Sequence, residues 1–219
     1  MTNSPPERVP RLRPEQLTDE QRRLYDELLH GPRGRGRQFF ELTDADGVLT
    51  GPFNAMLASP RVGTAVQRLG AALRYHAGLP DQARELVILV VAAHLGSAFE
   101  WHAHEPSARH FGVADEVIAA LRDGRPPSLT DQALRAAHDL AVALLSGEDV
   151  PDEHYAVMAG ALGMPGVFEV SAIVGYYWLL AAQLRLFRVE RPALADGRRP
   201  ASGPRAGAGA RAARQPREG

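Results

Sequence analysis

The sequence contains no cysteine and no lysine. Without cysteine the chain forms no disulfide and no thiolate metal site, and thiol peroxidase and cysteine-nucleophile chemistry are excluded. Its 25 basic residues, all arginine, stand against 26 acidic ones and leave a formal net charge of −1. So small a net charge favours neither nucleic acid nor an anionic membrane as a partner.

Long apolar runs and a signal-peptide core are also missing. The longest apolar run, residues 86–93, is far shorter than the ~20 residues that a membrane-spanning helix needs. We therefore expect a cytoplasmic protein with no membrane partner. At 219 residues and 45% hydrophobic composition, the chain can bury one core, so we expect a single domain over residues 1–195 that includes an N-terminal arm. Residues 196–219 hold no large apolar side chain and are predicted to be a disordered basic tail that solubilises the protein rather than binding nucleic acid specifically.

Helix-terminating residues recur along the chain while strand patterns are nearly absent, so the predicted fold class is all-α. Thr18 and Gln21 have capping-box spacing at the start of a first helix, which Gly31 and Pro32 end. The glycine-rich, charged segment 31–53 is predicted to be a solvated surface loop, with anion binding by Arg33, Arg35 and Arg37 as the alternative. Further helices are expected over residues 60–77, 81–95, 98–111, 115–121, 131–145, 151–162 and 167–187.

Two of the expected helices have opposite apolar patterns. The helix that begins at Pro60 carries a stripe formed by Val62, Val66, Leu69 and Leu73, which is typical of a helix with one face in the core. The next helix contains the run ELVILVVAAHLG, which is apolar on all sides. Such a helix belongs at the centre of the fold.

The stretch FEWHAHEPSARHFG, residues 99–112, concentrates ionisable side chains. Ser97 and Glu100 have capping-box spacing, which predicts a helix here that forms a hairpin with the central helix. On that helix Glu100 and His104 are four residues apart and share a face toward the core, whereas His102 and Arg109 point elsewhere.

The central helix begins close to Glu85, and a carboxylate in such apolar surroundings must reach water or find a hydrogen-bonding partner. If the hairpin closes, His104 is the candidate partner. The string His102-Ala103-His104-Glu105 is not the His-Glu-x-x-His pattern of zinc proteases, because its two histidines lie about 200° apart around a helix.

These residues resemble the carboxymuconolactone decarboxylase family, within the superfamily that includes the alkylhydroperoxidase AhpD. The resemblance rests on the run from Glu85 to Ala93 and on Phe99-Glu100-Trp101 followed by His104. It extends over most of the chain through the segments GPFNAML at 51, LGAALRY at 69, GYYWLL at 175 and FRVERP at 187.

AhpD-like members of the superfamily carry a reactive segment of Glu, then eleven residues, then Cys-x-x-Cys-x-x-x-His. That frame falls here on Glu85, Ser97, Glu100 and His104. Both redox cysteines are therefore replaced, and the Glu-Trp-x-x-His form resembles the non-redox branch of the family.

The resemblance implies an AhpD-like helical bundle built around the central helical hairpin and assembled as a homotrimer or a dimer of trimers. It also implies a small-molecule substrate and no cofactor, since the founding reaction of the family is loss of CO₂ from a lactone acid. Two residues depart from the pattern. Pro106 lies inside the motif helix and is expected to bend it, and Arg185 stands where similar proteins carry Asn, which would alter the pocket floor.

On this model His104 is the general acid/base, Glu85 holds its tautomer or relays its proton, and Glu100 is a second carboxylate. The alternatives are that Glu85 and His104 form only a buried structural pair, or that these three residues form an oxygen/nitrogen metal site, although the main prediction contains no metal.

Substrate binding is predicted at five further residues. Arg74, next to Tyr75 at the end of an apolar stripe, is the candidate for holding a substrate carboxylate, with a surface position as the alternative. Asn54, Trp101 and Tyr176 are candidates for lining the pocket. Trp101 could instead serve only core packing.

Three function classes follow. The leading prediction is a cofactor-independent lyase, such as a decarboxylase, or an isomerase acting on a small carboxylate or lactone. An alkylhydroperoxidase-type enzyme is the second, and it conflicts with the absence of cysteine. The third is a non-catalytic protein that binds a small molecule or assembles with itself.

Overall fold

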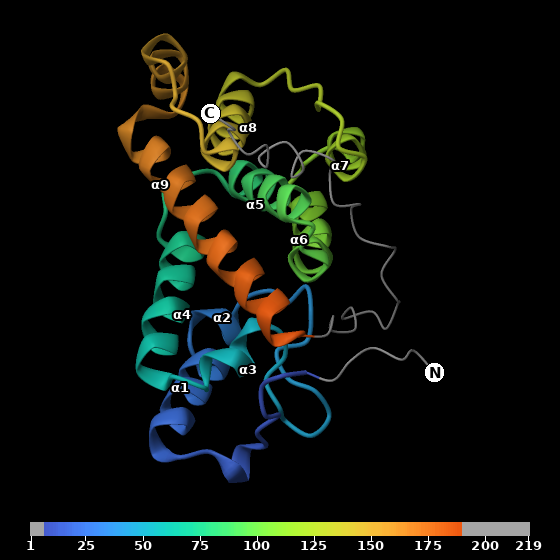
Figure 1. Ribbon diagram of the computed structural model, residues 1–219, viewed down its shortest axis with the longest axis vertical. Coiled ribbons are helices and arrows are strands. Elements are labelled where there is room, and N and C mark those ends of the chain that lie inside the picture. Colours follow the sequence, from blue (N-terminus) through green and yellow to red (C-terminus); the bar gives the residue numbers. More distant parts are fainter. Residues whose placement is uncertain (1–6, 190–219) are drawn as a thin grey trace, which may run out of the picture.

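The computed structural model describes residues 7–189 (Figure 1), and the predicted basic tail at 196–219 lies outside them. Over this range the fold is all-α, as predicted, with an isolated antiparallel bridge between Thr43 and Leu49. A short 3-10 helix, Pro14–Gln16, precedes the helices. These are α1 (Asp19–His30), α2 (Pro32–Arg35), α3 (Pro52–Met56), α4 (Pro60–Tyr75), α5 (Asp81–Leu95), α6 (Ala98–His110), α7 (Asp115–Arg122), α8 (Gln132–Ser146) and α9 (Asp152–Phe187).

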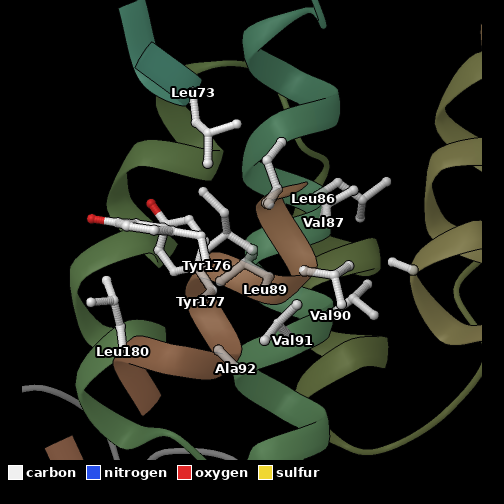
Figure 2. Packing of buried hydrophobic residues seen from close by; sticks show 14 of the residues in the cluster. Leu73, Leu86, Val87, Leu89, Val90, Val91, Ala92, Tyr176, Tyr177 and Leu180 are labelled. Atoms are coloured by element: carbon white, nitrogen blue, oxygen red, sulfur yellow. The ribbon is translucent and has the colours of Figure 1, made fainter. Parts of the chain in front are cut away.

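Helix α5 is the centre of the fold, as its apolar sequence predicts. It packs against α6, α8 and α9, and its residues from Leu86 to Leu89 are fully buried. Figure 2 shows side chains of α5 gathered with Tyr176, Tyr177 and Leu180 of α9. The tight left-handed turn at Gly96 returns the chain into α6, so the predicted hairpin is confirmed.

Two helix starts differ in their capping. Thr18 accepts a hydrogen bond from the backbone of Gln21, and the capping box predicted there is confirmed. Ser97 makes no side-chain cap at the start of α6, so the second predicted capping box is wrong. The carboxyl group that was expected to cap this helix, Glu100, is instead buried in the interior.

The core-facing side of α4 was predicted only in part. Of the expected stripe, Leu73 is buried and Val66 packs against the core, but Val62 and Leu69 are exposed. Gly63, Gln67 and Gly70 are buried in their place. The reason is close approach between helices: a Cβ atom at Gly70 would overlap the hydroxyl of Tyr176. Helices α4 and α9 lie side by side (Figure 1), and small residues on α4 leave room for the aromatic side chains of α9.

The two helices expected over 151–162 and 167–187 form one element, α9, with a kink at Gly163, where φ is 66°. By length and composition alone α9 could cross a membrane. One side of it, including Val170, Ile173 and Leu180, nevertheless lies in the hydrophobic core. The opposite side is exposed at Phe168 and Trp178.

The segment predicted as a surface loop between α1 and α4 is only partly irregular. It contains the short helices α2 and α3, and all five residues of α3 are buried. Proline at the first position of each helix and a glycine before it account for these starts. This segment carries Arg33 toward the interior, as described below.

Candidate active site

Glu85 of α5 and His104 of α6 face each other across the hairpin, as predicted. The Oε2 atom of Glu85 lies 2.8 Å from Nδ1 of His104, and both side chains are buried. Because a carboxylate only accepts hydrogen bonds, the donor is the Nδ1–H of the imidazole. This contact leaves Nε2 of His104 as the ring nitrogen available for proton exchange.

Two arginines share the carboxylate of Glu85. Its Oε1 atom lies 3.4 Å from Arg84 and 3.7 Å from Arg74. Burial alone would raise the pKa of Glu85, but His104 and the two guanidinium groups outweigh it and lower the pKa to about 2. Glu85 is therefore a fixed negative charge.

His104 is held neutral. Burial lowers its pKa below the usual 6.5, and the positive charges of Arg74 and Arg84 act in the same direction, against the attraction of Glu85. The ring of Tyr177 meets the imidazole edge to face, with centroids 5.0 Å apart. The imidazole is thus fixed in orientation by a carboxylate on one side and an aromatic ring on another.

Glu100 lies on the other side of the imidazole, with its Oε2 atom 3.6 Å from Nε2 of His104. Burial raises the pKa of Glu100 to about 8, against the opposing effect of Arg33 and Arg74. Its Oε1 atom is buried and has no hydrogen-bond partner among residues 7–189. Near neutral pH Glu100 is therefore a protonated acid beside the free nitrogen of His104.

Helix α9 contributes Tyr176 in addition to Tyr177. Tyr176 is buried, its ring meets that of Tyr177 edge to face, and burial raises the pKa of its hydroxyl to about 12. Arg33, Glu100 and Arg74 all act on this hydroxyl. Tyr176 is therefore neutral near pH 7, and its role in lining a pocket stays a prediction.

The substrate-binding candidates are only partly brought together. Arg74 belongs to the site through its contact with Glu85, so its surface alternative is wrong. Tyr75 is 37% exposed, outside the buried group. The indole of Trp101 donates to Glu105 and lies against Arg122, and the amide of Asn54 donates to the carbonyl of Pro10. These contacts fix the side chains of Trp101 and Asn54, whose role in lining a pocket stays a prediction.

Helix α6 continues through Pro106 to His110, and the bend expected at this proline stays a prediction. Two expectations for neighbouring residues need correction. His102 is on a different face from His104 but is buried, not turned away from the core. Arg185 is exposed in the last turn of α9, so its difference from related sequences does not alter a buried pocket floor.

Three residues of the site were not predicted from the sequence. Arg84 adjoins Glu85 and is 5% exposed, and a charged residue inside an apolar helix was the available signal. Tyr177 was overlooked beside Tyr176, since helix periodicity alone does not decide which tyrosine meets His104. Arg33 was assigned to a solvated loop with anion binding as the alternative, and no local pattern indicates that its charge acts on Glu100.

The metal alternative finds no support in the described part of the chain. It contains no group of three His, Cys, Asp or Glu side chains placed to hold a metal ion. Glu85 already has both oxygens engaged by His104 and arginines, so Glu85 lacks a free position for a cation.

Comparison with known proteins supports the family. Residues 60–143, which contain Glu85, Glu100 and His104, match the model of the carboxymuconolactone decarboxylase family. Over these residues the chain is similar to the carboxymuconolactone decarboxylase family. No curated protein matches the sequence.

Solved structures show the same fold. A peroxidase-related protein from Ralstonia eutropha JMP134 with an alkylhydroperoxidase AhpD core is 16% identical, with a TM-score of 0.65 over 85% of this chain and 93% of that one. A putative antioxidant defence protein AhpD from Agrobacterium tumefaciens is 21% identical, with a TM-score of 0.57 over 65% and 99%. The debrominase Bmp8, solved as a cysteine-to-alanine variant with 2,3,4-tribromopyrrole, is 16% identical, with a TM-score of 0.65 over 87% and 95%. The fold of this protein is therefore AhpD-like.

Proposed function

We propose that this protein is a cofactor-independent acid/base enzyme, a lyase such as a decarboxylase or an isomerase, that acts on a small carboxylate or lactone. The observation that carries the proposal is the row of three buried groups, Glu85, His104 and Glu100. One end is an ionised carboxylate, the centre is a neutral imidazole and the other end is a protonated acid. The row can store and move one proton without a cofactor.

The groups of the row have distinct roles. Glu100 in its acid form supplies the proton, either directly to substrate carbon or through Nε2 of His104. Glu85 stabilises the imidazolium that forms when Nε2 accepts a proton. Loss of CO₂ from a lactone acid breaks the bond between the carboxylate carbon and the ring, moves its electron pair into the conjugated lactone and needs one proton on carbon. For an isomerase, Nε2 removes a proton from one carbon and the row returns it to another.

The frame of the redox superfamily members argues against thiol chemistry. Ser97 and Glu100 stand at the places of the redox cysteines, and the whole chain has no cysteine. We place the protein in the non-redox Glu-Trp-x-x-His branch on this basis. Purified protein should consume hydroperoxide with thiol reductants no faster than buffer does, and saturable thiol-dependent turnover would disprove this placement.

The experiment that tests the proposal uses carboxymuconolactone, the compound in the family name, as a first substrate, with CO₂ release as the readout. His104→Gln should lower turnover by about 100- to 10,000-fold, as expected for loss of a general acid/base. His94→Gln is the matched control, since His94 is exposed on α5. If wild type is active and His104→Gln keeps its activity, the pair is structural and the proposal fails. If wild type turns over neither this lactone nor a series of related lactones and carboxylates, the non-catalytic alternative is favoured.

A further inference from the structure

Arg33 is a cation without an anionic partner. Its guanidinium carbon lies 4.8 Å from the ring centre of Phe53, and its Nε atom is buried with no hydrogen-bond partner among the described residues. No carboxylate of residues 7–189 lies within ion-pair distance of it. Arg74 and Arg84, by contrast, share the charge of Glu85.

The position of Arg33 is set by the packing of α2. A Cβ atom at Gly34 would overlap the carbonyl of Leu29 at the end of α1. Only glycine therefore allows the backbone of α2 to approach the end of α1 this closely. Gly36, at the other end of α2, faces the hydroxyl of Tyr75. Helix α2 is therefore wedged between α1 and the end of α4 that carries Arg74.

Aromatic rings connect Arg33 to the acid end of the proton row. Phe53, under the guanidinium, stacks on Phe40 with centroids 6.3 Å apart. Phe40 in turn meets Phe99 edge to face at 5.9 Å, and Phe99 directly precedes Glu100 on α6. These contacts connect Arg33 through three aromatic rings to the residue that precedes Glu100.

Two further polar groups of the site have unused hydrogen-bonding capacity. The buried Oε1 atom of Glu100 has no partner in the described part of the chain. The positive charge of Arg33 acts on both Glu100 and the hydroxyl of Tyr176. The charge of Arg33 is thus close enough to act on a neutral acid and on a neutral hydroxyl, while the fixed anion Glu85 is already balanced by Arg74 and Arg84.

We propose that Arg33 binds the anionic group of a carboxylate substrate. This inference rests on the proposed function, since it concerns the same site, and it replaces Arg74 with Arg33 as the anion-binding residue. A guanidinium with free N–H donors binds a carboxylate through charge-assisted hydrogen bonds.

The test uses benzoate and its neutral counterpart benzamide as probes, with binding to the full chain measured by calorimetry. Wild type should bind benzoate more tightly than benzamide. Arg33→Gln should weaken benzoate binding by about 10- to 100-fold, because a charge-assisted pair is lost, and should change benzamide binding little. Arg33→Lys should keep part of the preference, since it retains the charge without the planar group.

Arg35→Gln is the matched control, because Arg35 lies on the same short helix and is exposed. It should bind both probes as wild type does. Wild type that does not prefer benzoate, or a folded Arg33→Gln that keeps the full preference, would overturn the inference. Because probe binding requires no turnover, an unaffected Arg33→Gln together with an inactive His104→Gln would refute only the role of Arg33. Weakened benzoate binding by Arg33→Gln together with a fully active His104→Gln would refute only the proposed reaction.

Discussion

The Nε2 atom of His104 lies 3.6 Å from the Oε2 atom of Glu100, so a neutral imidazole and a protonated carboxyl group adjoin in the protein interior. The opposite nitrogen of the same ring is bound to an ionised carboxylate. Of these two glutamates, Glu85 is negatively charged and Glu100 is neutral near pH 7. The difference follows from their neighbours, since arginines and His104 adjoin Glu85 while Glu100 is buried with less compensation.

Turnover by the wild type should decline as the pH rises through about 8, the pKa of Glu100. Above that pH Glu100 is ionised and no longer donates a proton. A pH–rate profile measures this, and activity that is constant from about pH 7 to about pH 9 would contradict the role of Glu100 as acid. The charged and titratable groups that face Glu100 are Arg33 from α2, Arg74 from α4, Glu85 from α5, His104 from α6 and Tyr176 and Tyr177 from α9.

Glu100→Gln should change how stability depends on pH. The pKa of Glu100 is raised to about 8 in the folded protein, against roughly 4.3 in an unfolded chain. Its contribution is therefore fully present below about pH 4.3 and is lost as the pH rises toward 8. Urea unfolding should show that Glu100→Gln gains stability relative to wild type between about pH 5 and about pH 9. Glu116→Gln, an exposed change on α7, should show no such trend.

Glu85→Gln should have the opposite effect. The folded pKa of Glu85 is about 2, below the unfolded value of roughly 4.3, so its contribution is present above about pH 4.3 and is lost as the pH falls toward 2. At neutral pH the variant should be less stable by on the order of 3 kcal/mol, because buried Arg84 and Arg74 lose their shared anion. Chemical denaturation of the variant and of wild type, at neutral pH and near the pKa of about 2, measures this difference. Equal stability of the variant and wild type at neutral pH would show that the charge of Glu85 is dispensable for folding.

Gly70→Ala should destabilise the protein by about 1–3 kcal/mol, because the added methyl group overlaps the hydroxyl of Tyr176. Gly175→Ala on α9 is the control, since nothing lies within 4 Å of a Cβ atom there. That control should be neutral or stabilising, as alanine favours helix over glycine. Thermal unfolding of both variants compares them directly. Similar losses from the two changes would mean that α4 and α9 are not packed this closely.

Self-association remains a prediction. Phe168 and Trp178, on the exposed side of α9, are 72% and 53% exposed, and Val62 and Leu69 of α4 are exposed as well. Large apolar side chains on neighbouring helices favour contact with further copies of the chain. Light scattering should report a trimer or hexamer for the wild type. The Phe168→Arg variant should show a larger fraction of monomer. A wild-type monomer at micromolar concentration would refute this assembly.

Several features of the protein could be predicted from the sequence because they depend on local spacing. The absence of cysteine excludes thiol chemistry without any structure. Capping residues and an all-apolar helix predict an α-helical fold with α5 at its centre. The spacing of four residues puts Glu100 and His104 on one face, and a lone Glu85 in an apolar helix requires a partner, for which the closing hairpin offers His104.

Other features were decided only by the tertiary structure, because they depend on which surfaces meet. The apolar stripe of α4 does not reveal that its glycine face packs on Tyr176, since a glycine has no side chain to contribute to a hydrophobic pattern. The burial of His102 and the turn of Trp101 toward Glu105 depend on contacts beyond their own helix. The convergence of Arg33, Arg74 and Arg84 joins segments far apart in the chain. Glu85 is charged and Glu100 is neutral because the pKa of a glutamate depends on its burial and on neighbouring charges, not on residue type alone.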